Sequence, residues 1–342
     1  MNNDNDNSQE KELPEEKETK SSSNKKNNEN IPIPDSVSTE STQVPVDTRK
    51  TKITSNTGYA DISQEKDVPL ITGNPIDIKN IDSNFVFFFG ISGSGKTVIL
   101  SAILYYYGTQ AGALGPKLDT QNTKPAKALL YEWFTKLKKG MLPDRSPLNQ
   151  LTRLDFVFKP NNKSKKVTPI NLTFLETAGG NHSDISRGGN YINSIDAYLS
   201  SNIPLQVIIV TSFDTAEGDD VLINEFFDLL ETKGKNLNSV NLILVISKWD
   251  ISGRTGVSHE EELEDFIQLK LPITNKRVNT FELNKTYFTI GNVISTANGE
   301  RIEEVNLASA ELLSKWLYQN ISGVPLDYEG TFLERIKFSL FP

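Results

Sequence analysis

The chain has 342 residues, no cysteine, two histidines and a formal net charge of −8. The lack of cysteine excludes disulfides and thiolate chemistry, and two histidines argue against a histidine-rich zinc site. The negative charge argues against nucleic acid as a partner, and no run of about 18 apolar residues is present to span a membrane. No apolar segment stands at the N-terminus. We therefore expect a cytoplasmic protein.

The aromatic residues divide the chain unevenly. Tyr59 is the first aromatic residue and Phe85 the second, so residues 1–58 lack the side chains of an ordinary core. This polar, charged stretch is predicted to be a disordered tail. Residues 59–80 are predicted to be a linker that partly packs on the body, and residues 81–342 to form one folded domain.

From residue 84 onward, short apolar runs alternate with helical patterns. The run Asn84–Phe89 (NFVFFF) is typical of a strand buried on both faces of a sheet. The predicted elements are a strand at 84–89, helices at 97–107 and 124–139, strands at 154–158 and 170–175, a helix at 190–200, a strand at 205–211, a helix at 219–232, a strand at 241–246, a helix at 260–269, a strand at 285–290 and a helix at 307–319.

The order of these elements predicts an α/β fold. The strands at 154–158 and 170–175 flank a polar turn and indicate an antiparallel hairpin. The other strands are separated by helix-sized segments, which favours a mostly parallel sheet with helices on both faces and right-handed crossovers. In such a fold, ligands bind at the carboxyl ends of the strands.

A phosphate-binding pattern directly follows the first apolar run. Residues Gly90–Thr97 (GISGSGKT) match GxxxxGKT and precede a predicted helix. Glycines let the backbone amides point at a phosphate chain, while Lys96 reaches the outer phosphates and the Thr97 hydroxyl ligates Mg2+. The start of the helix adds its positive end to the site. The pattern predicts nucleoside triphosphate binding.

A second strand end carries the sequence ETAG. The carboxylate of Glu176 can hold Mg2+ through a water, and the amide of Gly179 can contact the terminal phosphate. An ordinary acidic turn is the alternative. If the terminal phosphate binds at Gly179, the loop that follows would change position when the phosphate is present or absent.

A third strand end carries SKWD. A carboxylate at Asp250 can accept hydrogen bonds from the ring and exocyclic nitrogens of guanine, which adenine does not offer in that arrangement. The stem of Lys248 can cover the face of the base. An ion pair on a loop is the alternative. The motif therefore favours guanine recognition.

Together these motifs resemble the P-loop GTPase domain of the TRAFAC class, the Ras-like G domain, over residues 80–325. Within that class the chain is most similar to bacterial GTPases sometimes called double-GTPase-like. The resemblance implies GTP/GDP and Mg2+ as cofactors and a switch protein that hydrolyses GTP to GDP and phosphate. It implies phosphate contacts and charge stabilisation by Gly90, Ser92, Gly93, Ser94, Gly95, Lys96 and Gly179, Mg2+ ligands at Thr97 and Glu176, and base contacts by Ser247, Lys248, Asp250, Gly291 and Asn292.

The chain departs from that family at three positions. Glu176 stands where the family usually has Asp, and Ser247 where it has Asn or Thr. Gly180 stands where Ras-like members carry a water-orienting Gln, so we expect slow hydrolysis. The candidates to replace that Gln, by positioning water or by acting as an arginine supplied in cis, are His182, Arg145, Arg153 and Arg187.

The resemblance also implies two switch segments. Residues 142–152 should supply a hydroxyl to Mg2+, with Ser146 and Thr152 as candidates and Thr152 slightly favoured. This segment and residues 180–191 are expected to contact a protein partner. The sequence leaves open whether a dimer supplies the missing catalytic group. Two alternatives remain: a pseudo-GTPase that binds nucleotide structurally within an assembly, and a P-loop ATPase or kinase.

Overall fold

The computed structural model describes residues 82–118, 123–144, 151–177, 179–182, 185, 193–253, 260–297 and 299–330. The predicted tail and linker lie outside these ranges. The elements of the larger sheet and its helices are β1 (Asn84–Phe89), α1 (Lys96–Tyr106), β2 (Gly112–Pro116), α2 (Thr123–Lys138), β3 (Leu151–Pro160), β4 (Ile170–Thr177), α3 (Asn193–Ser200), β5 (Leu205–Ser212), α4 (Ala216–Thr232), β6 (Asn241–Ser247), α5 (Glu260–Lys270), α6 (Pro272–Thr280), β7 (Asn284–Tyr287) and α7 (Ala308–Ser322). A π-helical turn (Tyr107–Ala111) follows α1, and β8 (Val293–Thr296) with β9 (Gly299–Ile302) form a separate hairpin.

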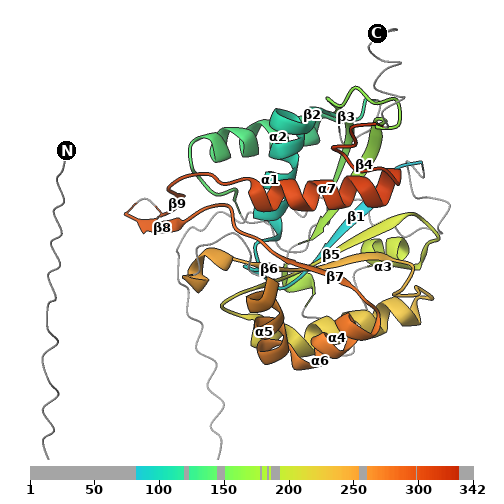
Figure 1. Cartoon of the computed structure of the whole chain (residues 1–342), viewed down its shortest axis with the longest axis vertical. Coiled ribbons are helices and arrows are strands. Elements are labelled where there is room, and N and C mark those ends of the chain that lie inside the picture. The colour runs from blue at the N-terminus through green and yellow to red at the C-terminus, as the bar shows by residue number, and fades with distance from the viewer. Residues whose placement is uncertain are drawn as a thin grey trace, which may run out of the picture. The chain divides into compact units, whose positions relative to one another are not determined.

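The described residues form a seven-stranded sheet in the order β2-β3-β4-β1-β5-β6-β7 (Figure 1). Strands β4, β1, β5, β6 and β7 pair in parallel. Strand β3 pairs antiparallel with β4, with Leu154 opposite Phe174, and β2 pairs antiparallel with β3. The predicted α/β fold, with a mostly parallel sheet and an antiparallel hairpin, is confirmed.

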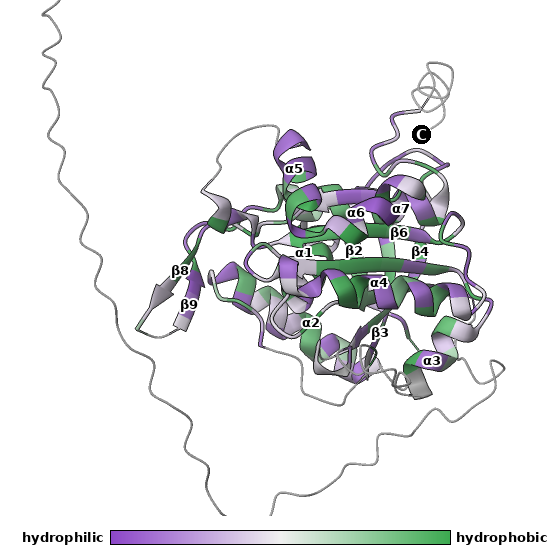
Figure 2. Ribbon diagram, turned by 90° about the horizontal axis from the view of Figure 1, so that it is seen from below, coloured by the Kyte–Doolittle hydropathy of each residue, from purple (hydrophilic) through white to green (hydrophobic). Residues whose placement is uncertain are grey.

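Helices cover both faces of the sheet, and β1 shows why its sequence is continuously apolar. Val86 and Phe88 pack in the cluster that contains α1, α2 and α7, whereas Phe85, Phe87 and Phe89 pack in the cluster of α3, α4, α5 and α6. Successive side chains of a strand point to opposite faces, so a strand covered on both sides needs apolar residues throughout. Figure 2 shows this layering, with largely hydrophobic strands between helices of mixed character.

Three elements were not predicted from the sequence. Strand β2 (GALGP) contains two glycines and a proline, and it forms because it lies at the sheet edge, where proline is tolerated. Helix α6 begins with Pro272, and the side chain of Asp220 in α4 accepts hydrogen bonds from the amides of Ile273 and Thr274. The β8–β9 hairpin is the third.

Within the described ranges, no helix combines the length and apolar character needed to cross a membrane.

Candidate functional site

The phosphate-loop sequence Gly90–Thr97 runs from the end of β1 into the first turn of α1. Gly90 has a φ of 149°, and a Cβ there would lie 2.1 Å from the carbonyl oxygen of Val210 and 2.8 Å from Ser94 Oγ. The loop can therefore follow this path only with glycine at its start. Within the described part of the chain, the buried Ser94 Oγ has no hydrogen-bond partner.

Lys96 points back into this loop. Its side chain is buried, and Nζ donates to the carbonyl oxygens of Gly90 at 2.7 Å and Ile91 at 2.9 Å. Desolvation by burial lowers the pKa of Lys96 to about 8, although the charges of Glu176 and Asp219 act in the opposite direction. The ammonium thus lies inside the turn of the loop, where it can contact an anion bound by the loop amides.

The two side-chain oxygens predicted to serve Mg2+, those of Thr97 and Glu176, lie side by side next to the loop. The hydroxyl of Thr97 donates to Glu176 Oε1, and Glu176 is buried near the end of β4. In the described part of the chain, no group of three or more His, Asp or Glu side chains could hold a metal. A site of this kind suits Mg2+, which is often held by one or two protein oxygens together with substrate phosphates.

The other predicted Mg2+ and switch residues are less completely described. The backbone of Thr152 pairs directly opposite Glu176 in the β3–β4 ladder. The side chain of Thr152 lies outside the described part, as do Ser146, Arg145 and Arg187. The register therefore places the backbone of Thr152 beside that of Glu176, the predicted Mg2+ ligand.

Gly179 lies against the phosphate loop. A Cβ on this residue would be 2.0 Å from the amide nitrogen of Ser92 and 2.1 Å from the carbonyl carbon of Ile91. No side chain fits at such a distance, so only glycine permits this approach. The strand end that carries ETAG is thereby brought into contact with the loop, and Gly180 follows in a short 3-10 turn.

His182 lies in the core. It is fully buried, its ring packs edge-on against Phe89 at 4.8 Å and Phe87 at 6.1 Å, and Nε2 lies 2.6 Å from Thr177 Oγ1. Burial, and next the charge of Lys96, lower the pKa of His182 well below its usual value of 6.5. This position argues against the predicted role of His182 in positioning water.

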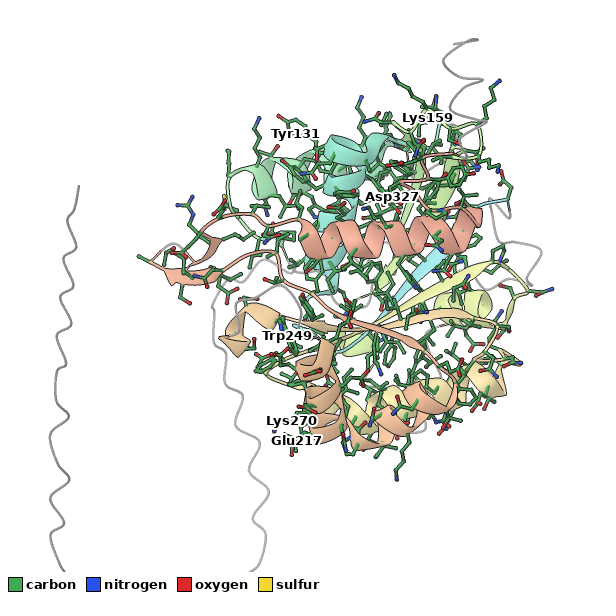
Figure 3. The ribbon with its side chains drawn as sticks, in the orientation of Figure 1. Tyr131, Lys159, Glu217, Trp249, Lys270 and Asp327 are labelled. Carbon is green, nitrogen blue, oxygen red and sulfur yellow. The ribbon has the colours of Figure 1, made fainter. Side chains whose placement is uncertain are left out.

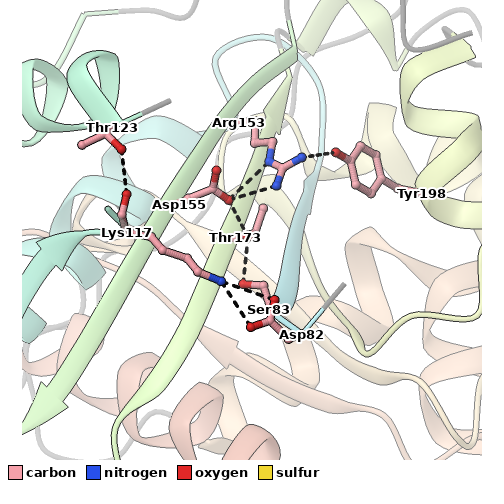
Figure 4. Close-up of polar contacts among 8 residues, drawn as sticks. All are labelled: Asp82, Ser83, Lys117, Thr123, Arg153, Asp155, Thr173 and Tyr198. Carbon is pink, nitrogen blue, oxygen red and sulfur yellow. Dashed lines mark hydrogen bonds and ion pairs between the residues drawn. The ribbon is translucent and has the colours of Figure 1, made fainter. Parts of the chain in front are cut away.

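Arg153 belongs to a polar network on the sheet (Figure 4). Its Nε donates to Asp155 Oδ1 at 3.2 Å and its Nη1 to the hydroxyl of Tyr198 at 3.1 Å. Thr173 donates to the same Asp155 oxygen at 2.7 Å. With its guanidinium held in this network, Arg153 is poorly placed to act as the arginine that stabilises a transferred phosphoryl group.

The SKWD segment lies at the end of β6, beside the phosphate loop. Ser247 Oγ donates to the carbonyl oxygen of Ser94 at 2.6 Å, and Lys248 Nζ pairs with Asp214 at 3.0 Å. Trp249, labelled in Figure 3, is buried and stacks on Tyr287 with ring centroids 5.4 Å apart. Trp249 is thus a packing residue, and its charged neighbours in the chain are Lys248 and Asp250.

Asp250 has a partner that the sequence analysis did not identify. The Thr289 hydroxyl lies 3.4 Å from Asp250 Oδ1 and 3.2 Å from the carbonyl oxygen of Gly291, and its single proton is shared between these two acceptors. Thr289 lies just beyond β7, which is shorter than the predicted strand at 285–290. Its hydroxyl at the end of the next parallel strand was the available signal, because the carboxyl ends of parallel strands meet at one edge.

Gly291 and Asn292 were predicted to contact the base. Gly291 has a φ of 118°, and a Cβ there would lie 2.0 Å from the carbonyl oxygen of Glu304. Asn292 Nδ2 donates to Glu303 Oε2 at 2.6 Å. These contacts shape the turn that leads into β8, whereas the neighbouring Thr289, Ile290 and Val293 line the cavity described next.

A cavity of about 480 Å³ brings the two ends of the candidate site together. Gly93, Lys96, Thr97 and Gly179 line its phosphate-loop end, and Ser247, Lys248 and Asp250 line its other end. Its size falls within the range of roughly 300–1,000 Å³ that is usual for small-molecule sites. The cavity lies at the carboxyl ends of β1, β4, β5 and β6, as expected for a parallel sheet.

No known family model matches the sequence, and no curated protein does. Among solved structures, the Chaetomium thermophilum signal recognition particle receptor SRb-GTP/SRX complex is similar with a TM-score of 0.38 and 14% identity, covering 69% of this chain and 98% of that chain. The Methanosarcina barkeri Roco2 RocCORdC structure bound to GDP is similar with a TM-score of 0.32 and 13% identity, covering 75% and 55%. This chain thus spans about half of the second structure. Both likenesses are distant, and the fold assignment rests on the strand order and pairing above.

Proposed function

We propose that the protein binds GTP or GDP together with Mg2+ in this cavity and hydrolyses GTP slowly, as a nucleotide-dependent switch. One observation carries the proposal: a single cavity is lined by the phosphate loop at one end and by Asp250 at the other. A nucleotide has an anionic end and a planar base separated by a sugar, so a site for it needs both chemistries within one cavity.

The phosphate-loop end suits a polyphosphate. Lys96 and the loop amides would bind the outer phosphates, and the buried Ser94 hydroxyl is a further polar group of this loop. Thr97 and Glu176 would hold Mg2+, which supplies positive charge to the phosphates when bound. Gly179 packs on the loop, and its amide is the proposed contact for the terminal phosphate.

The other end suits guanine. Guanine offers hydrogen-bond donors at a ring nitrogen and at an exocyclic amine, and a fixed carboxylate accepts both. Asp250 lines the cavity, and the Thr289 hydroxyl lies 3.4 Å from its carboxylate. The stem of Lys248 lies beside it, with the ammonium paired to Asp214, so its methylene groups can cover the base.

The expected rate of hydrolysis is low for a structural reason. Gly180 has no side chain to orient water, His182 is buried in the core, and Arg153 is held by Asp155 and Tyr198. The same observation favours a second candidate, a protein that binds guanine nucleotide without turning it over. In either case, segments 142–152 and 180–191 are the proposed contacts for a protein partner.

Binding is tested by titrating labelled GTP into the nucleotide-free full chain with Mg2+. GTP and GDP should displace the label and ATP should not; equal displacement by ATP would overturn the guanine assignment. Lys96→Ala should abolish tight binding, whereas Lys276→Ala, an exposed lysine on α6, should not. Single-turnover phosphate release then decides between the two candidates, since release no faster than in buffer supports binding without turnover.

A further inference from the structure

The β8–β9 hairpin contributes a wall to the cavity. It directly follows the turn at Gly291 and Asn292, and it projects from one end of the body (Figure 1). Its antiparallel register pairs Val293 with Ile302 and Ser295 with Glu300. Nothing in the family resemblance assigns a role to these residues.

The register gives the hairpin two different faces. Residues two apart along a strand share a face, and so do residues directly opposite each other on paired strands. Val293, Ser295, Glu300 and Ile302 therefore share one face. Val293, Ser295 and Glu300 line the cavity, and Ile302 is buried in the core. The inner face is thus apolar at the base of the hairpin and polar toward its tip.

Contacts with the end of α2 hold this inner face toward the cavity. The amide of Ile302 donates to the carbonyl oxygen of Gly140 at 2.8 Å, and Met141 forms a β-bridge with Arg301. Arg301 Nη2 also donates to the carbonyl oxygen of Lys139 at 3.2 Å. A Cβ on Gly140 would lie 2.6 Å from the carbonyl oxygen of Ile302, so the two backbones meet without a side chain between them.

We propose that the Ser295–Glu300 pair is a subsite for the sugar hydroxyls of the nucleotide, a step that rests on the proposed function. The cavity's phosphate end and base end are both supplied by other residues. The remaining part of a ribonucleotide is a sugar with two neighbouring hydroxyl groups, and each can donate a hydrogen bond. A carboxylate accepts such bonds, as acidic residues do for the 2′-hydroxyl in dinucleotide sites, and a serine hydroxyl can accept or donate. The pair thus selects ribonucleotides over 2′-deoxyribonucleotides.

The test is the affinity of the full chain for GTP, dGTP and ITP in Mg2+. We expect the wild-type protein to bind GTP roughly tenfold more tightly than dGTP, because a hydrogen bond to a charged group is lost. Glu300→Ala should bring this ratio close to one by weakening GTP alone, and Ser295→Ala should lower it less. Glu304→Gln alters an exposed carboxylate just beyond β9 and serves as the matched control, with an unchanged ratio.

Three results would overturn the sugar subsite. Equal affinity of the wild-type protein for GTP and dGTP would remove its basis. Parallel weakening of both by Glu300→Ala would show that the residue only supports the cavity wall. A changed GTP-to-ITP ratio with an unchanged GTP-to-dGTP ratio would show that Glu300 reads the base amine. Failure of the wild-type protein to bind any of the three would instead overturn the proposed function itself.

Discussion

Ser247 Oγ donates a 2.6 Å hydrogen bond to the carbonyl oxygen of Ser94, which ties the end of β6 to the phosphate loop. The two residues are far apart in sequence, but parallel pairing of β1, β5 and β6 brings their strand ends to one edge of the sheet. The bond holds the strand end that carries Ser247 against the phosphate loop.

Ser247→Ala should therefore weaken both stability and nucleotide binding. Loss of a buried hydrogen bond leaves the Ser94 carbonyl without this donor and should cost about 1–3 kcal/mol in the free energy of unfolding. Urea unfolding and calorimetric titration with GDP measure the two effects. Ser239→Ala removes an exposed hydroxyl that bonds the backbone of a surface turn, and should change both much less. Equal losses in the two variants would contradict this prediction.

Gly179→Ala should separate the ETAG strand end from the phosphate loop. The new methyl group would lie about 2 Å from the backbone of Ser92, closer than any real contact, so one segment must move. We expect weaker GTP binding with a smaller effect on GDP, since the amide of Gly179 is assigned to the terminal phosphate. Gly218→Ala in α4, where a Cβ meets no atom within 4 Å, is the control. An unchanged GTP-to-GDP affinity ratio would refute the assignment.

Asp250→Asn should shift preference from guanine to xanthine nucleotides. The amide of Asn donates where the carboxylate accepted, and xanthine offers an oxygen in place of the guanine amine. Competition between GTP and XTP for labelled nucleotide measures the shift. Asp265→Asn, an exposed carboxylate on α5, should keep the wild-type preference. Retention of full GTP preference by Asp250→Asn would show that this residue does not read the base.

The free energy of unfolding of Asp219→Asn, relative to that of the wild-type protein, should increase as pH rises. Asp219 is 4% exposed, accepts a 2.6 Å hydrogen bond from Thr211, and has its pKa raised above 3.8, mainly because burial disfavours the charged form. The folded state therefore binds this proton more tightly than the unfolded state does. The wild-type protein loses stability as pH rises from 3.8 through the higher folded pKa, and Asn escapes that loss.

The measurement is the difference in free energy of unfolding between Asp219→Asn and wild type across this pH window. It should rise from acid toward neutral pH and then level off. The same measurement on Asp265→Asn, which alters an exposed carboxylate on α5, is the control for the substitution itself. A difference that is constant with pH would contradict a raised pKa and would assign the effect to changed hydrogen bonding with Thr211.

Much of the sheet could be predicted because its signals are local. The run Asn84–Phe89 is continuously apolar, since helices cover both faces of β1, and the hairpin strands are separated by a polar turn. The glycine pattern from Gly90 to Thr97 is also read from consecutive residues, although the close approach that requires Gly90 is made to the carbonyl oxygen of Val210 in β5. Helix α6 was missed because its cap is the side chain of Asp220 in another helix.

The sequence by itself determined most of the strands and helices, with β2, α6 and the β8–β9 hairpin as exceptions, and the residues that can meet a phosphate, because periodicity and glycine spacing act over a few neighbouring positions. Only the tertiary structure decided that His182 faces Phe89 in the core and that Thr289 reaches Asp250. It also decided that the β8–β9 hairpin turns Ser295 and Glu300 into the cavity. These contacts join segments that are far apart in the sequence and that meet only in the folded sheet. A pattern within a few neighbouring residues does not predict them.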